Sequence, residues 1–408
     1  MKTHFLKVNP TEQQIIEHHN SIANELHERK DFKNVICKKP WGYEFLVYES
    51  EKLGIWYLKL EKGGSTSLHT HFHKDTFMIV LSGCAKLTLI DNEVLSLSAF
   101  ESVFIPKEKF HAISTFSDET YILEMEIFDT TAKFSDKNDL LRIDDQYNRK
   151  KTGYESSIEL VTTNLHDYAH FYLGAGFQKE MFGANLSVFE VTEDSVKTIQ
   201  SYQYAILLRG ELYSQGNVLK EGSLLREKAY EGISKGALVL GLEKIGWQED
   251  SKLIYSMDHL RLKVKELKLS KKQVVLSSGC FDILHVGHLE ILKKAKALGD
   301  CLIVCLSNDE QIRKLKGENR PVNNYEDRIN LFKTIPYVDY IVLYEESNIE
   351  REETLGSIMK CVDPAMWVKG TDYTVEKILD KHPYLKKIVL IPLVENKSTT
   401  NIIQKIKT

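Results

Sequence analysis

Residues Gly279–His288 read Gly-Cys-Phe-Asp-Ile-Leu-His-Val-Gly-His, and this stretch decides how the carboxyl-terminal part of the chain folds. A short apolar run precedes it, and Leu289–Ala295 follows it with the spacing of an amphipathic helix. His285 and His288 are therefore expected where a buried strand turns into a helix. The free N–H groups and the positive end of the helix dipole suit that position to phosphate, and Gly287 lets a nucleotide approach the backbone closely. The two imidazoles can donate hydrogen bonds to a phosphorus centre as its charge rises.

The rest of this region alternates strand-like and helix-like patterns. The apolar runs are Val274–Leu276, Cys301–Cys305, Tyr340–Leu343, Met366–Val368 and Ile388–Ile391. Such alternation predicts parallel βαβ units and a doubly wound α/β sheet, which binds its ligand at the carboxyl ends of the strands. The segments that follow these strands, residues 279–288, 307–309, 369–373 and 395–400, should therefore converge on one cleft.

The His-x-Gly-His sequence in this strand–turn–helix context resembles the nucleotidylyltransferase superfamily that includes the cytidylyltransferases and the heptose-phosphate adenylyltransferases. Three later segments fall in the family's order: Lys314–Val322 (Lys-x-Lys-Gly…Arg-Pro), Trp367–Tyr373 (Val-Lys-Gly-x-Asp-Tyr) and Ser398–Ile403 (a Ser-Thr-Thr helix start). The resemblance implies transfer of a nucleotidyl group from CTP or ATP to a sugar- or polyol-phosphate, with release of pyrophosphate. It also implies Mg²⁺ bound with the nucleotide, which seldom needs an all-protein cage.

The same resemblance assigns roles to individual residues. His285 and His288 would contact the α- and β-phosphates in the transition state, and Lys316 and Arg320 would clamp the phosphates. The residues expected at the nucleotide are Gly279, Phe281, Asp282, Gly287, Lys369, Asp372, Ser398 and Thr399. Plainer alternatives stay open, because His285 or Ser398 could only cap a helix, and the basic loop could be a solvated face.

The base of the nucleotide is open. Leu393–Thr400 lacks the arginine and glycine of the Arg-Thr-x-Gly-x-Ser-Thr-Thr signature that glycerol-phosphate cytidylyltransferases carry. The lysine-rich loop and the Val-Lys-Gly-x-Asp-Tyr segment look more like the adenylyltransferase half of ADP-heptose synthases. In those proteins the domain is often joined to a sugar kinase, whereas here it follows β-rich sequence, so a heptose acceptor is not implied.

Short alternating runs separated by turn residues extend from residue 41 to 129, which predicts an all-β barrel or sandwich. The segments Pro40–Gly42, Gly63–His73, Ile79–Gly83 and Ile105–Pro106 with His111 resemble a cupin of the mannose-6-phosphate isomerase type. A cupin implies a transition metal (Zn, Fe, Mn or Ni), here on His69, His71, His73 and His111. Because side chains alternate along a strand, His69, His71 and His73 would share one face. Thr76 stands where the pattern has its glutamate.

The resulting prediction is a multidomain protein. It has a helical segment over residues 1–35, a cupin barrel over 36–130, a divergent second cupin-like β domain over 131–250, a linker helix over 251–270 and an α/β nucleotidylyltransferase domain over 271–408. The cupin would isomerise the sugar phosphate before transfer, sense a sugar, or hold a homodimer together. Cys301 and Cys305 read as core residues.

Composition narrows the class of protein. The chain has 408 residues, 42% hydrophobic and 27% charged, as expected for globular domains. Its net charge of −4 gives no basic field to suggest a nucleic-acid partner. No apolar run approaches the roughly 20 residues that span a membrane. The six scattered cysteines and the absence of a signal-like segment predict reduced thiols and a cytoplasmic protein.

Overall fold

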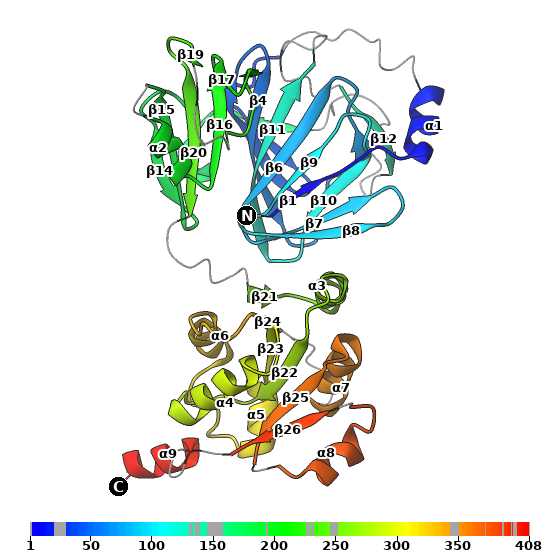
Figure 1. Cartoon of the computed structure of the whole chain (residues 1–408), viewed down its shortest axis with the longest axis vertical. Helices are drawn as coiled ribbons and strands as arrows, with labels where there is room; N and C mark the ends of the chain where they lie inside the picture. The colour runs from blue at the N-terminus through cyan, green and yellow to red at the C-terminus, as the bar shows by residue number, and fades with distance from the viewer. Residues whose placement is uncertain are drawn as a thin grey trace. The chain divides into compact units, whose positions relative to one another are not determined.

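The computed structural model describes residues 2–19, 30–129, 134, 139–144, 158–192, 195–225, 230, 232–244, 252–342, 351–371, 373–385, 387–392, 394 and 398–407. The chain divides into two compact units, Met1–Gln248 and Glu249–Thr408 (Figure 1). The first unit is built from β-sheets and the second from a parallel sheet with helices, which confirms the multidomain prediction. Among the described helices, none is long and apolar enough to cross a membrane.

The first unit contains a barrel of two sheets. An eight-stranded sheet has the order β1-β9-β6-β11-β4-β3-β2-β13, and a five-stranded sheet has the order β12-β5-β10-β7-β8. Alternation along each strand separates two faces: on β11, Ile122 points into the barrel core, whereas Leu123 and Met125 point outward. The strands are β1 (Thr3–Phe5), β2 (Ile36–Lys39), β3 (Gly42–Glu49), β4 (Leu53–Glu61), β5 (Leu68–Thr70), β6 (Lys74–Ser82), β7 (Cys84–Leu89), β8 (Val94–Ser98), β9 (Ser102–Ile105), β10 (His111–Thr115), β11 (Glu119–Phe128), β12 (Leu141–Asp144) and β13 (Glu159–Val161).

The amino-terminal segment is only partly helical where it is described. Helix α1 (Pro10–His18) begins at Asn9, which forms a capping box with Glu12. Strand β1 precedes this helix and pairs in parallel with β9, so the segment is part of the barrel. Residues 20–29, which were also expected to be helical, lie outside the described residues.

The barrel also extends beyond residue 130, where the cupin was expected to end. Strand β12 pairs with β5, and strand β13 pairs with β2. Neither strand is long, at four and three residues, which is why the polar sequence around them reads as a connection.

A second β region follows within the same unit. Its four-stranded sheet has the order β14-β15-β20-β16, and a three-stranded sheet has the order β18-β17-β19. Residues of the four-stranded sheet, including Leu186 and Ile206, share a core with Phe45 and Tyr57 on the outer face of the barrel. The elements are the 3-10 helix η2 (Leu165–Tyr168), β14 (Gln178–Met181), β15 (Ala184–Glu190), α2 (Val196–Ser201), β16 (Tyr204–Arg209), β17 (Leu212–Ser214), β18 (Asn217–Leu219), β19 (Gly232–Ile233) and β20 (Leu238–Lys244).

The second unit is a three-layer α/β structure. Its six-stranded sheet is parallel, in the order β21-β24-β23-β22-β25-β26, and the order reverses at β22 (Figure 1). Such a reversal opens a crevice at the carboxyl ends of the two strands involved, here β22 and β25. The elements are β21 (Leu253–Ile254), α3 (Met257–Leu269), β22 (Val274–Gly279), α4 (Val286–Lys296), β23 (Cys301–Leu306), α5 (Asp309–Lys316), α6 (Tyr325–Lys333), β24 (Tyr340–Val342), α7 (Arg351–Val362), β25 (Met366–Gly370), α8 (Val375–Lys381), β26 (Ile388–Ile391) and α9 (Thr399–Lys407).

Two apolar layers hold helices on the two faces of this sheet. One layer includes residues of α4 and α6, and the other includes residues of α3, α7 and α8. Helix α3 was expected as a linker, but Leu260 and Val264 are buried in the second layer, so the helix belongs to the α/β unit. The prediction that Cys301 and Cys305 are core residues is confirmed: both are buried free thiols.

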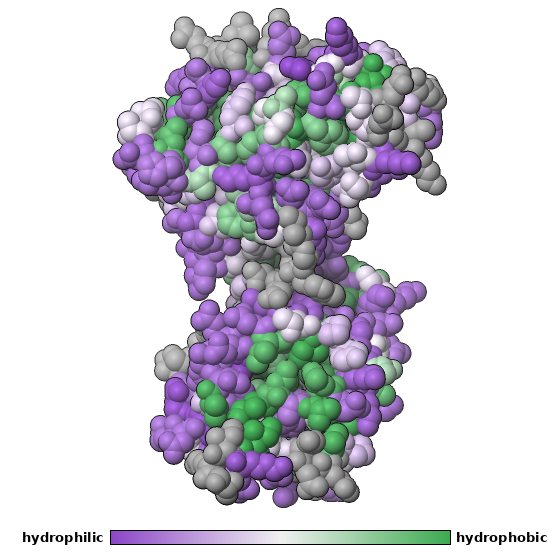
Figure 2. Space-filling view, turned by 90° about the vertical axis from the view of Figure 1, so that its left-hand side faces the viewer, coloured by the Kyte–Doolittle hydropathy of each residue, from purple (hydrophilic) through white to green (hydrophobic). Residues whose placement is uncertain are grey.

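Apolar residues gather on the face of this unit that carries α4 and α6 (Figure 2). On these helices Val286, Leu289 and Leu331 are exposed. Val286 lies between His285 and Gly287, so the apolar surface borders the loop that was expected to bind the nucleotide.

Candidate functional sites

Two histidines lie together at the start of α4. Strand β22 ends at Gly279, and α4 begins after His285, which occupies the N-cap position. The rings of His285 and His288 stack with their centroids 3.8 Å apart. Burial, together with the neighbouring His285, lowers the pKa of His288 to about 4, so this ring is neutral near pH 7. Phe281 packs edge-on against His288, and its ring also contacts that of Phe332 at an interplanar angle of 57°.

Asp282, in the loop after β22, contacts the loop that carries Arg320. Its side chain is only 1% exposed and forms an ion pair with the guanidinium of Arg320. Its other oxygen accepts hydrogen bonds from the backbone N–H groups of Val322 (2.7 Å) and Asn323 (3.0 Å). Asp282 therefore fixes the loop that carries Arg320, rather than pointing a free carboxylate at a ligand.

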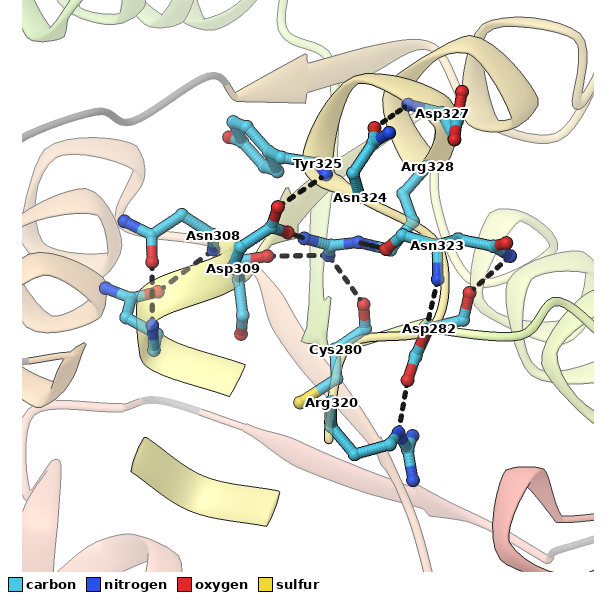
Figure 3. Close-up of polar contacts among 12 residues, drawn as sticks. Cys280, Asp282, Asn308, Asp309, Arg320, Asn323, Asn324, Tyr325, Asp327 and Arg328 are labelled. Carbon is cyan, nitrogen blue, oxygen red and sulfur yellow. Dashed lines mark hydrogen bonds and ion pairs between the residues drawn. The ribbon is translucent and has the colours of Figure 1, made fainter. Parts of the chain in front are cut away.

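Arg328 connects the loops of the same region through buried hydrogen bonds. It was not among the site residues predicted from the sequence. The side chain is fully buried and donates to the carbonyl oxygens of Cys280 (2.8 Å), Ser307 (2.6 Å) and Asn323 (3.1 Å). Figure 3 shows the contacts with Cys280 and Asn323. It also donates to the carboxylate of Asp309 at 2.7 Å. One guanidinium thus joins the loops after β22 and β23 to the start of α6.

A signal for Arg328 does exist in the sequence. Tyr325, Ile329 and Phe332 share one face of α6 with Arg328 by their spacing, and Ile329 and Phe332 pack in the core. A charged residue on the apolar face of a helix needs buried partners, which makes it a candidate for a structural or functional role.

Lys369, Ser398 and Thr399 were also expected in this cleft, and each contacts a different part of the structure. Lys369 is buried at the end of β25 and donates to the carbonyl oxygen of Ser278 at 2.6 Å. Ser398 caps α9, and the hydroxyl of Thr399 lies 3.5 Å from the carbonyl oxygen of Ile283, so the start of α9 is held at the loop after β22.

Four further residues complete this set. Gly287 is buried in the first turn of α4, and a Cβ on Gly279 would lie 2.8 Å from the ring of Phe281. Lys316 is exposed at the end of α5, and none of the described contacts joins it to the histidines. Asp372 lies outside the described residues.

A second group of polar residues lies inside the barrel. The ligand atoms of His69, His71 and His111 all lie within 4.8 Å of one another. His69 and His111 meet because they are paired across β5 and β10. His71 joins them just after β5 ends.

Hydrogen bonds orient all three rings. The Nδ1 atoms contact the backbone oxygens of Ser67 (2.8 Å, from His69), Asp139 (2.6 Å, from His71) and Lys109 (3.0 Å, from His111). This pattern leaves Nε2 available in each ring, and the buried Nε2 of His111 has no hydrogen-bond partner among the described residues. Burial lowers the pKa of all three histidines, that of His111 to about 4, so the rings are neutral. Neutral, oriented imidazoles with converging nitrogens fit a divalent transition metal.

His73 does not join this cluster, which corrects the expected ligand set. Its Nδ1 lies 3.5 Å from a carboxylate oxygen of Asp129 instead. The alternation of side chains that places every second residue on one face of a strand does not apply to His73. Strand β5 ends at Thr70, and the next strand begins at Lys74.

Two family models match this chain, one over the region of the histidine pair and the other over the barrel. Residues 276–405, which contain the histidine pair and the loops tied by Asp282 and Arg328, match the family described as cytidylyltransferase-like. This unit contains a cytidylyltransferase-like domain. Residues 24–145 match the family described as mannose-6-phosphate isomerase C-terminal, which confirms the cupin resemblance of the barrel.

Several curated relatives match part of the chain. The bifunctional protein HldE of Wolinella succinogenes is 32% identical over 241 residues, which cover 54% of this chain and 49% of that protein. The protein of the same name from Campylobacter fetus is 42% identical over 154 residues, covering 38% of this chain and 31% of that protein. The chain thus spans about half the length, or less, of these curated relatives.

Some solved structures are similar to portions of the chain. A lipopolysaccharide core biosynthesis protein from Thermoplasma volcanium is 26% identical, covering 30% of this chain and 97% of that one, with a TM-score of 0.25. A cupin superfamily protein from Desulfitobacterium hafniense is 21% identical, covering 26% of this chain and 87% of that one, with a TM-score of 0.20.

Proposed function

We propose that the cytidylyltransferase-like domain transfers a nucleotidyl group from ATP or CTP to a sugar- or polyol-phosphate and releases pyrophosphate. The observation that carries this proposal is the stacked pair His285 and His288 at the start of α4, at the carboxyl end of the central strand β22. The product would be an activated sugar or polyol for surface polysaccharide synthesis.

The chemistry asks mainly for positioning and charge stabilisation. A phosphate oxygen of the acceptor attacks the α-phosphorus in line, and pyrophosphate leaves without a covalent protein intermediate. The ring N–H groups of His285 and His288 would donate to phosphate oxygens as their charge rises. Arg320, held beside the histidine loop by Asp282, would neutralise the departing pyrophosphate together with Lys316. Mg²⁺ would enter with the nucleotide.

Pyrophosphate release tests the proposal. The full-length protein would be incubated with Mg²⁺, each of ATP, CTP, GTP and UTP, and a panel of sugar and polyol phosphates. We expect a signal that requires both one nucleotide and one acceptor. ATP with a heptose phosphate would extend the resemblance to the substrate, and CTP with a polyol phosphate would limit it to the phosphate-binding residues. Folded protein that releases no pyrophosphate with any pair would contradict the proposal.

A second candidate function belongs to the barrel. We propose that His69, His71 and His111 bind a transition metal and that the cupin acts on a sugar phosphate, because three neutral rings present converging nitrogens there. The chain would then be bifunctional, with the cupin isomerising the acceptor before transfer. Chelation should abolish formation of the acceptor while leaving transfer to a supplied acceptor intact. A cupin that only senses a sugar would instead change the affinity of the transferase for its substrates.

A further inference from the structure

A groove on the α/β unit lies between α3 and α7. The two helices pack against each other on one face of the parallel sheet (Figure 1), and the space between their outer surfaces has a free volume of about 770 Å³. The described residues that line this groove all belong to α3 and α7, and not to the loops that follow β22, β23 and β25. The groove is therefore separate from the site at the start of α4.

Basic side chains from both helices line the groove. Arg261, Lys265 and Lys268 follow one another at spacings of four and three residues, so they share one face of α3, and Lys360 lies on α7. Burial raises the pKa of the Cys361 thiol on α7, and the positive charges of Arg261 and Lys268 act against this shift, so both cations lie near α7. No acidic residue lines the groove within the part of the chain that the structure describes.

Apolar side chains lie deeper in the same groove. Val264 is only 4% exposed and Met257 is half-buried, and both contribute to the apolar layer that packs on the sheet. Leu269, the last residue of α3, also lines the groove and is 76% exposed, more than any other large apolar residue in the described part of the chain. The groove thus combines an apolar base with positive charge along its edges.

This combination favours an acidic amphipathic helix as the occupant. A third helix can pack its apolar face into the groove between two packed helices, while its acidic face meets the lysines. Helix α3 has 13 residues and is about 20 Å long, so it can support three turns or more of a partner helix.

Two other occupants fit less well. A small phosphate compound needs a cation that is held in place by burial, whereas the side chain of Arg261 is 62% exposed and pairs with Asp258 at 2.6 Å. A membrane surface is flat, and Val264 and Met257 are recessed between the two helices, where a bilayer does not reach them.

We propose that the groove between α3 and α7 binds an acidic amphipathic helix of a partner protein. Leucine-like side chains of the partner would pack on Met257, Val264 and Leu269, and its carboxylates would pair with the lysines of the groove. The inference goes beyond the proposed transferase activity and does not depend on it. The groove lies on the face of the sheet opposite α4 and α6, so a docked helix leaves the start of α4 open to a nucleotide.

Fluorescence anisotropy with designed peptides tests the proposal on the full-length protein. The probe is a labelled peptide of about 14 residues that carries leucines on one helical face and glutamates on the other. One control peptide has lysines in place of the glutamates, and a second has serines in place of the leucines. We expect only the glutamate–leucine peptide to bind, and its affinity to fall as the salt concentration rises, because screening weakens exposed ion pairs.

Variants of the protein locate the binding site. Lys265→Glu/Lys268→Glu should raise the dissociation constant of the probe at least about tenfold, because like charges would then face each other. Leu269→Ser should also weaken binding, without any change of charge. Lys293→Glu/Lys294→Glu is the matched control, since it makes the same change of charge at two exposed lysines of α4, and it should bind like the wild type.

The proposal is wrong if the glutamate–leucine peptide does not bind, if the lysine peptide binds equally well, or if Lys265→Glu/Lys268→Glu binds the probe like the wild type. Vesicles of phosphatidylcholine with and without phosphatidylglycerol test the membrane alternative. Binding to the anionic vesicles that is lost in Lys265→Glu/Lys268→Glu, without peptide binding, would assign the groove to a membrane surface and overturn the proposal. Circular dichroism verifies that each variant is folded, and absence of pyrophosphate release would count against the proposed transferase activity alone.

Discussion

Replacement of Arg328 by methionine should destabilise the α/β unit strongly. The change removes four hydrogen bonds, three to backbone carbonyl oxygens and one to the carboxylate of Asp309, from a side chain with no exposed surface. Methionine fills a similar length but donates nothing, so acceptors that the guanidinium satisfied lose their donor. Breaking a buried charged pair costs about 3–5 kcal/mol, and we expect about 4 kcal/mol here.

Hydrogen–deuterium exchange read by mass spectrometry would locate the effect. A loss of about 4 kcal/mol corresponds to a roughly 10³-fold faster exchange of the most protected amides, at about 1.4 kcal/mol for each factor of ten. The acceleration should be found in peptides that cover β22, β23 and α6. Pyrophosphate release should also fall, because Arg328 holds the backbone of Cys280, two residues before Asp282, and that of Asn323, which donates hydrogen bonds to Asp282.

Arg261→Met provides the control for this prediction. Arg261 lies on α3 of the same unit, its side chain is 62% exposed, and it forms an ion pair with Asp258 at 2.6 Å. Loss of such a surface pair should change the free energy of unfolding by less than about 0.5 kcal/mol. If the amides of β22, β23 and α6 in Arg328→Met exchanged at rates within about threefold of the wild type, the hydrogen bonds of Arg328 would not stabilise the cleft, and the reasoning would be refuted.

Three further predictions follow from the histidines. His288→Ala should lower kcat for pyrophosphate release by roughly 10²–10³, the effect of losing one transition-state donor, and an unchanged kcat would remove His288 from the mechanism. Burial, together with the charge of Lys263, lowers the pKa of His259 from 6.5 to about 3. Between pH 6.5 and pH 3 the imidazole is therefore protonated in the unfolded chain and neutral in the folded one. The free energy of unfolding should therefore fall by about 2 kcal/mol from this residue between pH 6.5 and 5, and urea titrations of His259→Gln should lack that part of the slope. His111→Ala should lose the transition metal measured by elemental analysis, whereas His73→Ala should retain it, and equal losses would restore His73 to the ligand set.

Sequence periodicity was sufficient to predict the parallel sheet and the strand–turn–helix around His285. The reason is local: β22 begins with the continuous apolar run Val274–Leu276, and α4 begins at Val286, three residues before the run Leu289–Ala295 that has helical spacing. The same local reasoning assigned His73 to a strand face. It was wrong there because a turn separates β5 from β6, and the residues around that turn carry no glycine or proline to mark it.

Long-range contacts account for the other differences. Asp282 was expected at the nucleotide, yet its carboxylate contacts residues about 40 positions further along the chain, and no pattern within its own segment indicates that. Similarly, α3 reads as a charged linker because half of its surface is polar, although Leu260 and Val264 are buried against the sheet. Burial of this kind depends on which elements become neighbours, and a single sequence does not specify that directly.

The sheet formed by β14, β15, β20 and β16 covers apolar residues on the outside of the barrel. The solubility of the barrel therefore depends on residues that follow it in the sequence. A fragment that ends at residue 130 would lack β12 and β13 and would leave Phe45 and Tyr57 facing water. An apolar surface of that kind promotes aggregation, so soluble preparations of the isolated cupin should extend at least through Lys244. For the same reason, the part of the large sheet's outer face that carries Phe45 and Tyr57 is not available to a second copy of the chain.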